Sequence, residues 1–313
     1  MPKTIAILGN HKNLFGKLTE WFNNDSSYSL NVVHKPTTED LTPVAPDLIF
    51  CVYCEDNNDG YWKGIDRTYP APKIVYGNWG DRNFDAYFLQ YSHFASMAWQ
   101  RSYHIPQGRF TLLPLPIDIT EIPNANLDAS RPFKVMQSFI LSKGSMPVAH
   151  NKTAWLIKDV CEYNSIPFEL VTNLSKTEAF NKVSSEATLV IDQFWAGEIG
   201  MVSWEAMAMG IVPLVWASPD TIVEFTKVFG SFPPLLNLDI GNNTLNKKME
   251  LREREAIVRP VLTQTLLDLK NGSIDLIQRG AECRDWMLAN YNKQKIMDLY
   301  AGLWARFIDW REE

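Results

Sequence analysis

Apolar and polar positions alternate in blocks along the first part of the chain, and these blocks predict a parallel α/β sheet. Short apolar runs are typical of strands, and the segments between them are amphipathic or polar. The strand-like and helix-like segments are residues 4–9, 14–22, 29–35, 46–53, 73–79, 85–92 and 110–118. A strand–helix–strand rhythm of this kind favours a parallel sheet with helices on both faces.

A second alternation of the same kind begins at residue 132 and predicts a second α/β domain. Its segments are residues 132–140, 153–164, 167–173, 177–186, 187–194, 203–210 and 211–216. Between the two alternations, the Pro-rich residues 113–116 and the polar residues 118–131 predict a connection between domains. We therefore expect an N-terminal Rossmann-like domain at residues 1–130 and a second Rossmann-like domain at residues 131–290.

The C-terminal segment predicts one more helix. Its large apolar residues are spaced by four, three, four and three residues, and they are Ile296, Tyr300, Leu303, Phe307 and Trp310. Such a stripe is typical of core packing, and we expect the helix of residues 291–313 to pack back across the domain junction. The mixed-charge residues 245–260 predict a solvated helix.

Length and composition fit this two-domain interpretation. The chain has 313 residues, enough for two domains of about 150 residues each. Apolar residues make up 46% and charged residues 21%, as in ordinary globular proteins. The formal net charge of −6 argues against a large basic surface for nucleic acid. There is no run of about 18 apolar residues and no leader-like N-terminus, so we expect a cytoplasmic protein without an integral membrane segment.

Cysteine and histidine positions do not suggest a metal site. Four cysteines are scattered along the chain, and we interpret them as buried structural thiols: Cys51, Cys54, Cys161 and Cys283. Cys51 and Cys54 form a C-x-x-C, but residues three apart on a strand point to opposite faces. The histidines lack metal or relay spacing, and they are His11, His34, His93, His104 and His150. We therefore expect no metal and no cofactor.

The turn after the first strand, GNHKNLFGKL at residues 9–18, resembles a phosphate-binding loop only superficially. His11 stands where a P-loop needs glycine, and Leu18 replaces the required Ser or Thr. The turn also lacks G-x-G-x-x-G, which argues against a nicotinamide dinucleotide. Open α/β sheets bind ligands at the carboxyl edge of their strands, so we expect Asn10 and His11 to face a ligand there.

Residues 192–216, DQFWAGEIGMVSWEAMAMGIVPLVW, carry the strongest chemical signal. A buried strand ends at Asp192, and Gly197 and Gly200 allow a tight turn into a helix that we expect to begin near Met201. Unpaired amides at that helix start, together with the helix dipole, favour an anionic ligand. Glu205 lies one turn into this helix, where its carboxylate could accept hydrogen bonds from two neighbouring ribose hydroxyls. The small residues that follow suit close packing on a sheet.

The stretch GEIGMVSWEAMAMGIVPLV resembles the donor-site signature of retaining GT-B glycosyltransferases of the large family-four type (glycosyl transferases group 1). The specific match covers about 25 residues, a weaker one extends over residues 133–216, and the double α/β rhythm is similar to GT-B along the whole chain. The resemblance implies two Rossmann-like domains that face each other across a cleft. It also implies transfer of a sugar from a nucleotide-diphosphate sugar, with retention and without a metal. No Asp-x-Asp cluster occurs in the sequence, which agrees with metal independence.

The resemblance also assigns donor-side roles to individual residues. Of the family's two glutamates, Glu205 matches the one that binds the ribose, while the sugar-contacting one falls on Gly197, with Glu198 one residue later. Either Glu198 takes that role, or Asp192 and backbone amides near Ile199 and Gly200 do. The family's basic diphosphate ligands fall on Lys143 and Lys152, so the expected catalytic residues are Glu198, Lys152 and Lys143. We expect further donor contacts from Met201, Val202, Thr172 and Asn173.

The acceptor side departs from the family pattern. Many members carry a histidine at the end of the fourth strand, where this chain has Tyr76 and Gly77. The following polar residues could line an acceptor pocket, with a flat indole for a sugar ring, and they are Asn78, Trp79, Asp81 and Arg82. The expected partners are a nucleotide sugar and a sugar-containing or other hydroxyl acceptor. Two alternatives stay open: a catalytically inactive binding or scaffolding protein, and a nucleotide-sugar epimerase or hydrolase on the same fold.

Overall fold

The structure is a computed structural model, and its fold comprises two α/β units. It describes residues 2–9, 12–35, 44–53, 71, 73–77, 93–96, 110–138, 154–194, 197–241, 245 and 249–308. The first unit combines Met1–Asp118 with the C-terminal Asn292–Glu313, and the second is Ile119–Tyr291. The last helix of the chain therefore belongs to the same unit as the first strand.

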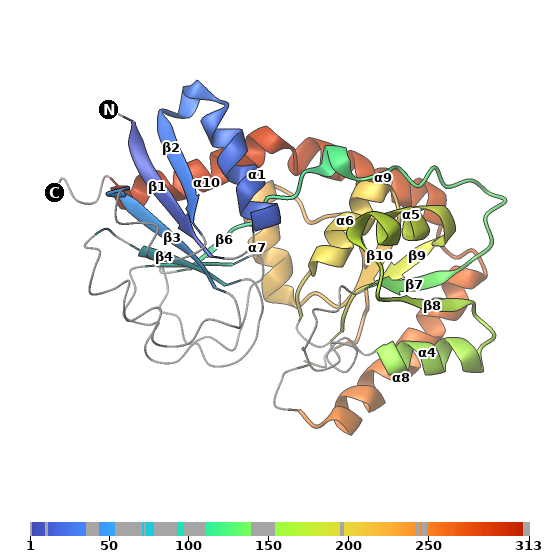
Figure 1. The fold of residues 1–313 in the computed structure, drawn as a ribbon. Helices are drawn as coiled ribbons and strands as arrows, with labels where there is room; N and C mark the ends of the chain where they lie inside the picture. Colours follow the sequence, from blue (N-terminus) through green and yellow to red (C-terminus); the bar gives the residue numbers. More distant parts are fainter. Residues whose placement is uncertain are drawn as a thin grey trace. The chain divides into compact units, whose positions relative to one another are not determined.

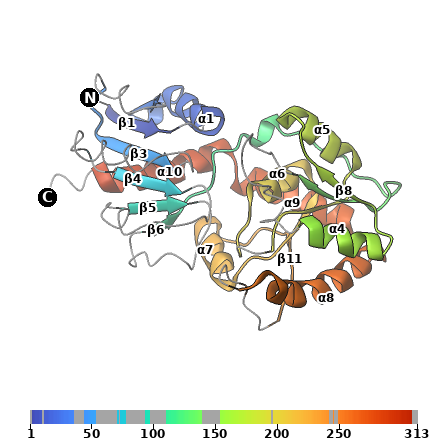
Figure 2. The ribbon, with the colours of Figure 1, turned by 60° about the horizontal axis from the view of Figure 1, so that its bottom comes forward.

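The first unit is built on a six-stranded parallel sheet (Figures 1 and 2). Its strands are β1 (Lys3–Leu8), β2 (Leu30–Lys35), β3 (Leu48–Tyr53), β4 (Lys73–Gly77), β5 (His93–Ser96) and β6 (Phe110–Leu112). They lie in the order β2-β1-β3-β4-β5-β6, with every neighbouring pair parallel. The sequence pattern predicted all of these strands except β5. The predicted segment at residues 85–92 lies outside the described residues.

Two helices that are far apart in the sequence cover one face of this sheet. They are α1 (Lys12–Asn23) and α10 (Lys293–Ile308), and α10 packs against both α1 and β3. The core between them is aromatic: the ring centroids of Phe50 and Tyr300 are 5.8 Å apart, and those of Phe22 and Trp304 are 5.0 Å apart. The Tyr300 hydroxyl donates a buried hydrogen bond of 2.9 Å to the carbonyl of Pro114. The C-terminal helix thus completes the core of the N-terminal sheet.

The buried stripe of α10 differs in part from the predicted one. Ile296, Tyr300 and Leu303 are buried as predicted, but Phe307 is only half-buried. Trp304 and Ile308 fill that part of the face, because a core-facing stripe is wider than a single line of residues. Trp310 lies outside the described residues.

The second unit holds a five-stranded parallel sheet with the same topology as the first. Its strands are β7 (Val135–Ser138), β8 (Phe168–Val171), β9 (Leu189–Ile191), β10 (Val212–Val215) and β11 (Leu236–Asn237). They lie in the order β11-β10-β9-β7-β8, and each neighbouring pair is parallel. In both units the second strand lies at an edge beside the first strand, and the third strand lies on the first strand's other side.

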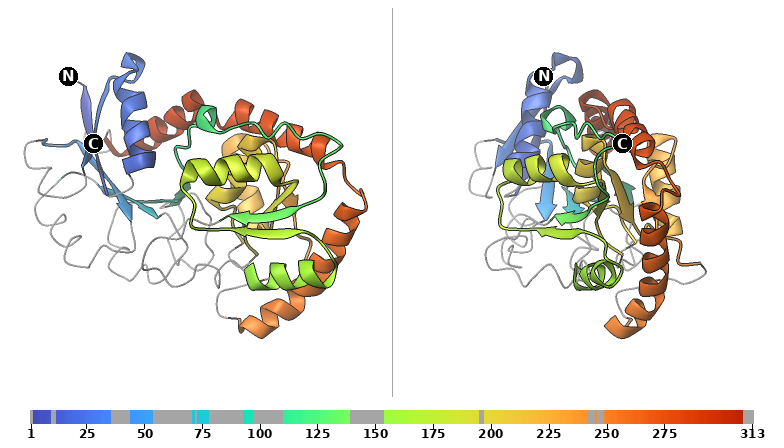
Figure 3. Two further views of the ribbon diagram at one scale, coloured as in Figure 1. Left: turned by 45° about the vertical axis from the view of Figure 1, so that its right-hand side comes forward. Right: turned by 90° about the vertical axis from the view of Figure 1, so that its right-hand side faces the viewer.

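Helices cover both faces of the second sheet (Figure 3). They are α4 (Ala154–Tyr163), α5 (Lys176–Glu186), α6 (Met201–Met209), α7 (Pro219–Phe229), α8 (Leu251–Lys270) and α9 (Leu276–Asn290). On one face α4 packs against β8 and α8. On the other, α5 contacts β7, while α6 contacts β9, β10 and α9. The connections β8–α5–β9 and β9–α6–β10 run in the same direction along the sheet. Because such crossovers are right-handed, α5 and α6 lie on the same face.

Two segments with polar sequences contribute residues to the core. The solvated helix predicted at residues 245–260 overlaps the first half of α8, where residues 252–257 are exposed or half-buried and Val258 is buried. Beyond the predicted segment, Leu262, Leu266 and Leu269 of α8 are buried in the core against α4. The predicted polar connection at residues 118–131 contains the short 3₁₀ helix η4 (Ile119–Glu121), and its Ile122 and Ala125 are buried.

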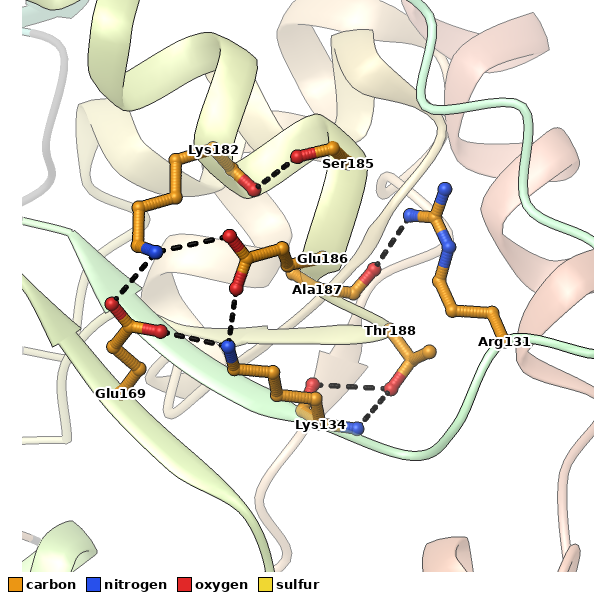
Figure 4. Close-up of polar contacts among 8 residues, drawn as sticks. All are labelled: Arg131, Lys134, Glu169, Lys182, Ser185, Glu186, Ala187 and Thr188. Carbon is orange, nitrogen blue, oxygen red and sulfur yellow. Dashed lines mark hydrogen bonds and ion pairs between the residues drawn. The ribbon is translucent and has the colours of Figure 1, made fainter.

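The charged residues at one corner of the second unit form a closed ring (Figure 4). Lys134 Nζ lies 2.7 Å from Glu169 and 2.5 Å from Glu186, and Lys182 Nζ lies 2.9 Å from each of the same two glutamates. Beside the ring, the Arg131 guanidinium donates to the carbonyls of Ser184, Ala187 and Ala125. The ring and Arg131 thereby tie the C-terminal turn of α5 to β7 and β8.

Candidate nucleotide-binding site

The candidate site lies at the carboxyl edge of the second sheet, beside the junction of β7 and β9. The chain reaches β8 and β9 on opposite sides of β7, and open α/β sheets bind ligands at such switch points. Gln137, fully buried on β7, donates from Nε2 to the carbonyl of Asp192 at 2.8 Å. This bond fixes the chain leaving β9 against β7, so the loop that follows starts from a set position.

Asp192 and Ser203 join the two ends of that loop. The Ser203 hydroxyl, in the first turn of α6, donates a buried hydrogen bond of 2.9 Å to Asp192 Oδ2. The same carboxylate lies against the Cα of Gly200, the N-cap of α6, where a Cβ would come 2.3 Å from Oδ2. Gly200 has an ordinary φ of −78°, so its backbone does not require glycine, contrary to the turn geometry that the sequence suggested. Position 200 requires glycine because a side chain there would clash with the Asp192 carboxylate.

Gly197 does require glycine for its backbone, as predicted. Its φ is +69°, and a Cβ would come 3.0 Å from both Ser218 and Trp216. Its carbonyl accepts 2.6 Å from the Thr221 hydroxyl and 2.9 Å from the Ser218 amide. Ser218 is the N-cap of α7, so the turn before α6 is held by the start of α7.

The helix α6 begins at Met201, as the sequence predicted, and it is buried from Ser203 onward. Met201 and Val202 are half-buried, while Glu198 (5% exposed) and Ile199 are buried. At the other end, the α6 carbonyls of Ala208 and Met209 accept from Arg284 and from the amide of Ala125. The last carbonyls of a buried helix need such partners, and here other segments of the second unit supply them.

Glu205 is paired with a lysine that the sequence interpretation did not single out. The Glu205 residue is 9% exposed, and its Oε1 lies 3.7 Å from Lys176 Nζ. Lys176 is the first residue of α5, and its side chain is 50% exposed. Because α5 follows β8 and α6 follows β9, both helices start at the carboxyl edge, and this ion pair joins them there.

The loop between β8 and α5 lies at the same carboxyl edge of the second sheet. Thr172 is half-buried, and the exposed Asn173 has a left-handed φ of +60°. Ser175 and Glu178 then form a capping box: the Ser175 hydroxyl accepts from the Glu178 amide, and Glu178 accepts from the Ser175 amide at 2.8 Å. This box sets the start of α5, so it also sets the position of Lys176.

The structure brings together one part of the predicted site. The donor-side residues Asp192, Gly197, Glu198, Ile199, Gly200, Met201, Val202 and Glu205 share the α6 entry, with Thr172 and Asn173 at the same sheet edge. The predicted catalytic Lys143 and Lys152 lie outside the described residues, and so do the acceptor-side residues Asn10, His11, Asn78, Trp79, Asp81 and Arg82. The fourth strand ends at Gly77, as expected.

Several structurally important residues were missed, and some left a sequence signal. Ser175 and Glu178 spell S-x-x-E immediately before a helical segment, which is a helix-start signature that also locates Lys176. Gln137 is a polar residue inside an apolar strand, which is the usual mark of a buried hydrogen-bonding role. Thr221 left no local signal, because its partner Gly197 lies on another loop.

The prediction that the cysteines are buried is confirmed for those in the described part of the chain. Cys51, Cys161 and Cys283 are all buried. Burial raises the pKa of Cys161 and of Cys283 to about 12, so neither thiol ionises near neutral pH. Cys54 lies outside the described residues.

The described part of the chain lacks two other kinds of feature, a cluster of metal ligands and a membrane-spanning helix. No group of three or more His, Cys, Asp or Glu side chains there could hold a metal ion. None of the helices described is both long enough and apolar enough to cross a membrane.

Comparison with solved structures identifies the architecture. A glycosyltransferase from Rickettsia africae ESF-5 aligns with a TM-score of 0.58 at 9% identity, over 98% of this chain and 98% of that one. Sucrose-phosphate synthase from Thermosynechococcus elongatus gives 0.56 at 12% identity, over 97% and 98%. The Anabaena protein HepE, solved with UDP-glucose, gives 0.53 at 10% identity, over 97% and 99%. The fold is GT-B.

No protein-family profile matches the sequence, and no curated protein matches it either. At 9–12% identity, the likeness to the solved structures establishes the GT-B fold and its two Rossmann-like units. Function has to be argued from the site.

Proposed function

We propose that this GT-B protein is a glycosyltransferase that moves a sugar from a nucleotide-diphosphate sugar to a hydroxyl acceptor, with retention and without a metal. The observation that carries the proposal is the placement of Glu205. Its carboxylate is buried one turn inside α6, at the carboxyl edge of a parallel sheet and beside the switch point. A buried carboxylate there suits the paired 2′ and 3′ hydroxyls of a ribose.

The donor diphosphate is assigned to the turn at residues 197–200 and the start of α6. A helix N-terminus offers backbone amides and the positive end of a dipole to an anion. Asp192 is already engaged by Ser203 and lies against Gly200, so we assign it the role of holding this turn. The buried Glu198 is then the better candidate for the donor-sugar contact.

The proposed reaction breaks the bond between the anomeric carbon and the diphosphate oxygen and forms a bond from that carbon to the acceptor oxygen. The acceptor hydroxyl gives up its proton, which is released to solvent, and the nucleoside diphosphate leaves with one more negative charge. Donors aimed at that charge lower the barrier, and removing one typically costs about 3 kcal/mol, or roughly a hundredfold in rate. We assign this role to Lys143 and Lys152 together with the amides near Gly200, and acceptor binding to Asn78, Trp79, Asp81, Asn10 and His11.

Nucleotide binding tests the proposal directly. UDP, GDP and ADP and their common sugar derivatives would be screened by calorimetry and thermal shift, using wild type, Glu205→Ala and the matched control Glu162→Ala. Glu162 is an exposed glutamate on α4. One nucleoside diphosphate at about 100 times its Kd should add about 2.7 kcal/mol of stability to wild type and to the control. Glu205→Ala should weaken its binding at least tenfold.

Turnover then separates this proposal from the alternatives. Loss of donor only in the presence of an acceptor supports transfer, and the configuration of the new bond tests retention. Donor consumption without any acceptor would instead indicate an epimerase or a hydrolase. Tight nucleotide binding without any turnover would indicate a binding or scaffolding protein. If no nucleotide binds at saturating concentration, the donor site proposed at residues 192–216 is wrong.

A further inference from the structure

Lys176 makes two contacts at the sheet edge where the candidate site lies. Its ammonium lies 3.7 Å from Glu205 Oε1 and 5.0 Å from the centre of the Phe180 ring, one turn along the same helix. A cation over an aromatic face is attracted by the ring, so the ring and the carboxylate together restrict a side chain that would otherwise be free in solvent. The lysine therefore presents its charge to Glu205 in a defined direction.

The position of Lys176 in its helix is unfavourable on local grounds. It is the first residue of α5, where the helix dipole favours acidic side chains and disfavours cations. The helix start does not depend on it, because Ser175 and Glu178 satisfy the first-turn groups through the capping box. Residues that are unfavourable for their own helix are often found at functional sites, where they have another role.

The ion pair with Lys176 stabilises the charged form of the Glu205 carboxylate. Burying a carboxylate is costly unless a charge or hydrogen bonds compensate it, and Lys176 supplies a positive charge 3.7 Å from the Glu205 carboxylate. A carboxylate has about four lone-pair sites on its two oxygens, and an ammonium only donates. An ammonium near Oε1 takes up at most one of these sites and offers no acceptor of its own that would compete for a ribose hydroxyl.

We propose that Lys176 is a positioning residue that orients the Glu205 carboxylate for the 2′ and 3′ hydroxyls of a donor nucleoside diphosphate. This inference rests on the proposed function of the same site. Lys176 acts through Glu205 and without touching the ribose. Its contribution should therefore appear only when both Glu205 and the ribose hydroxyls are present.

The experiment compares Lys176→Met, Lys176→Arg and the control Lys158→Met. Lys158 is a more exposed lysine on α4, paired with Glu162 at 3.5 Å. The probe is the nucleoside diphosphate that wild type binds best among UDP, GDP and ADP, together with its 2′-deoxy form. Lys176→Met should weaken binding of the ribonucleotide about twofold to fivefold, as expected for a partly exposed ion pair. Lys176→Arg should restore most of it, and Lys158→Met should change nothing.

Two further comparisons separate positioning from direct contact. The Lys176→Met penalty should largely disappear with the 2′-deoxy nucleotide, and it should disappear in a Glu205→Gln background. An equal penalty on ribose and deoxyribose forms would mean that Lys176 contacts the phosphate or the base, which overturns the inference. So would unchanged binding in Lys176→Met while Glu205→Ala is impaired, although the proposed function would stand. Failure of wild type to bind any nucleoside diphosphate would remove the proposed function and this inference with it.

Discussion

The Cα of Gly200 lies directly against the carboxylate of Asp192, so that a Cβ at position 200 would come 2.3 Å from Oδ2 and 2.8 Å from Oδ1. The contact joins the end of β9 to the first turn of α6, and the hydrogen bond from Ser203 to the same carboxylate reinforces it. The geometry of the helix entry therefore depends on a glycine and an aspartate that are eight residues apart in the sequence.

Gly200→Ala should destabilise the protein by about 1–3 kcal/mol, because the new methyl group has to displace a buried carboxylate. Urea unfolding would measure the loss. The control is Gly302→Ala on α10, where a Cβ meets nothing within 4 Å and the gain in helix propensity should be about 0.5–1 kcal/mol. In an Asp192→Ala background the cost of Gly200→Ala should fall sharply. Equal costs in the two backgrounds would show that the carboxylate is not what excludes a side chain.

Thr221→Val should loosen the turn before α6 while leaving the fold intact. The Thr221 hydroxyl donates 2.6 Å to the Gly197 carbonyl inside the core, and valine keeps the shape without the donor. The expected loss is about 1–2 kcal/mol of unfolding free energy. Nucleotide affinity, measured by calorimetry, should fall as well, because the turn at residues 197–200 is the proposed diphosphate contact. Thr226→Val is the control, since Thr226 is exposed and its hydroxyl donates to the Ile222 carbonyl in the same helix, α7. Undiminished affinity in Thr221→Val would argue against a role for this turn in binding.

Local sequence rules predicted the turn and the helix start of this site correctly. Gly197 has the positive φ that its position suggested, and α6 begins at Met201. These features depend on residues close together in the chain, where glycine and helix-start rules apply. The turn at Gly197 and the start of α6 could therefore be predicted from the sequence alone.

The side-chain partners at the site could not be predicted in the same way. Glu205 meets Lys176 only because two crossover helices start side by side at one sheet edge. The reason for Gly200 is likewise a contact with Asp192 and not a backbone requirement. The same limit applies to α10, whose apolar stripe was clear while its attachment to β3 and α1 depends on tertiary packing.

The charged ring around Lys134 should contribute to stability in a pH-dependent way. Hydrogen bonds from Lys134 and Lys182 hold the pKa of Glu169 and Glu186 below the ordinary value of 4.5. Burial opposes the charge on Lys134, but its bonds to the two glutamates outweigh this and raise its pKa above 10.5. A lowered carboxyl pKa stabilises the fold above about pH 4.5, and this stabilisation is lost as the pH falls through the folded-state pKa. The lysine contribution is present below pH 10.5 and is lost as the pH rises through the raised pKa.

Lys134→Met should therefore cost about 1 kcal/mol at pH 7, since the ring is a network of partly exposed pairs. The difference from wild type should shrink as the pH is lowered from 4.5 towards 3. Unfolding free energies measured by urea at several pH values would test both points. Lys158→Met, at an exposed pair, should show almost no loss at any of these pH values. A difference that grows towards acid pH would contradict the assignment of lowered carboxyl pKa values.

Trp304→Ala should unfold the first unit preferentially, although only nine residues follow Trp304 in the sequence. Its fully buried indole lies 5.0 Å from the ring of Phe22 and 5.8 Å from that of Phe50, so α10 carries part of the core of β1–β6. Removing such a side chain typically costs about 3–5 kcal/mol, whereas Tyr300→Phe, which removes the bond to Pro114, should cost about 1 kcal/mol.

Hydrogen exchange locates the effect of Trp304→Ala. Amides in β1, β2 and β3 should lose protection, while those in β7, β9 and β10 should keep it, because the rings packed on Trp304, those of Phe22, Phe50 and Tyr300, belong to the first unit. The exposed Arg306→Ala serves as the control and should stay within about 0.5 kcal/mol of wild type. Loss of protection centred on β7–β10 would mean that α10 stabilises the second unit instead. In that case the C-terminal helix would have been assigned to the wrong sheet.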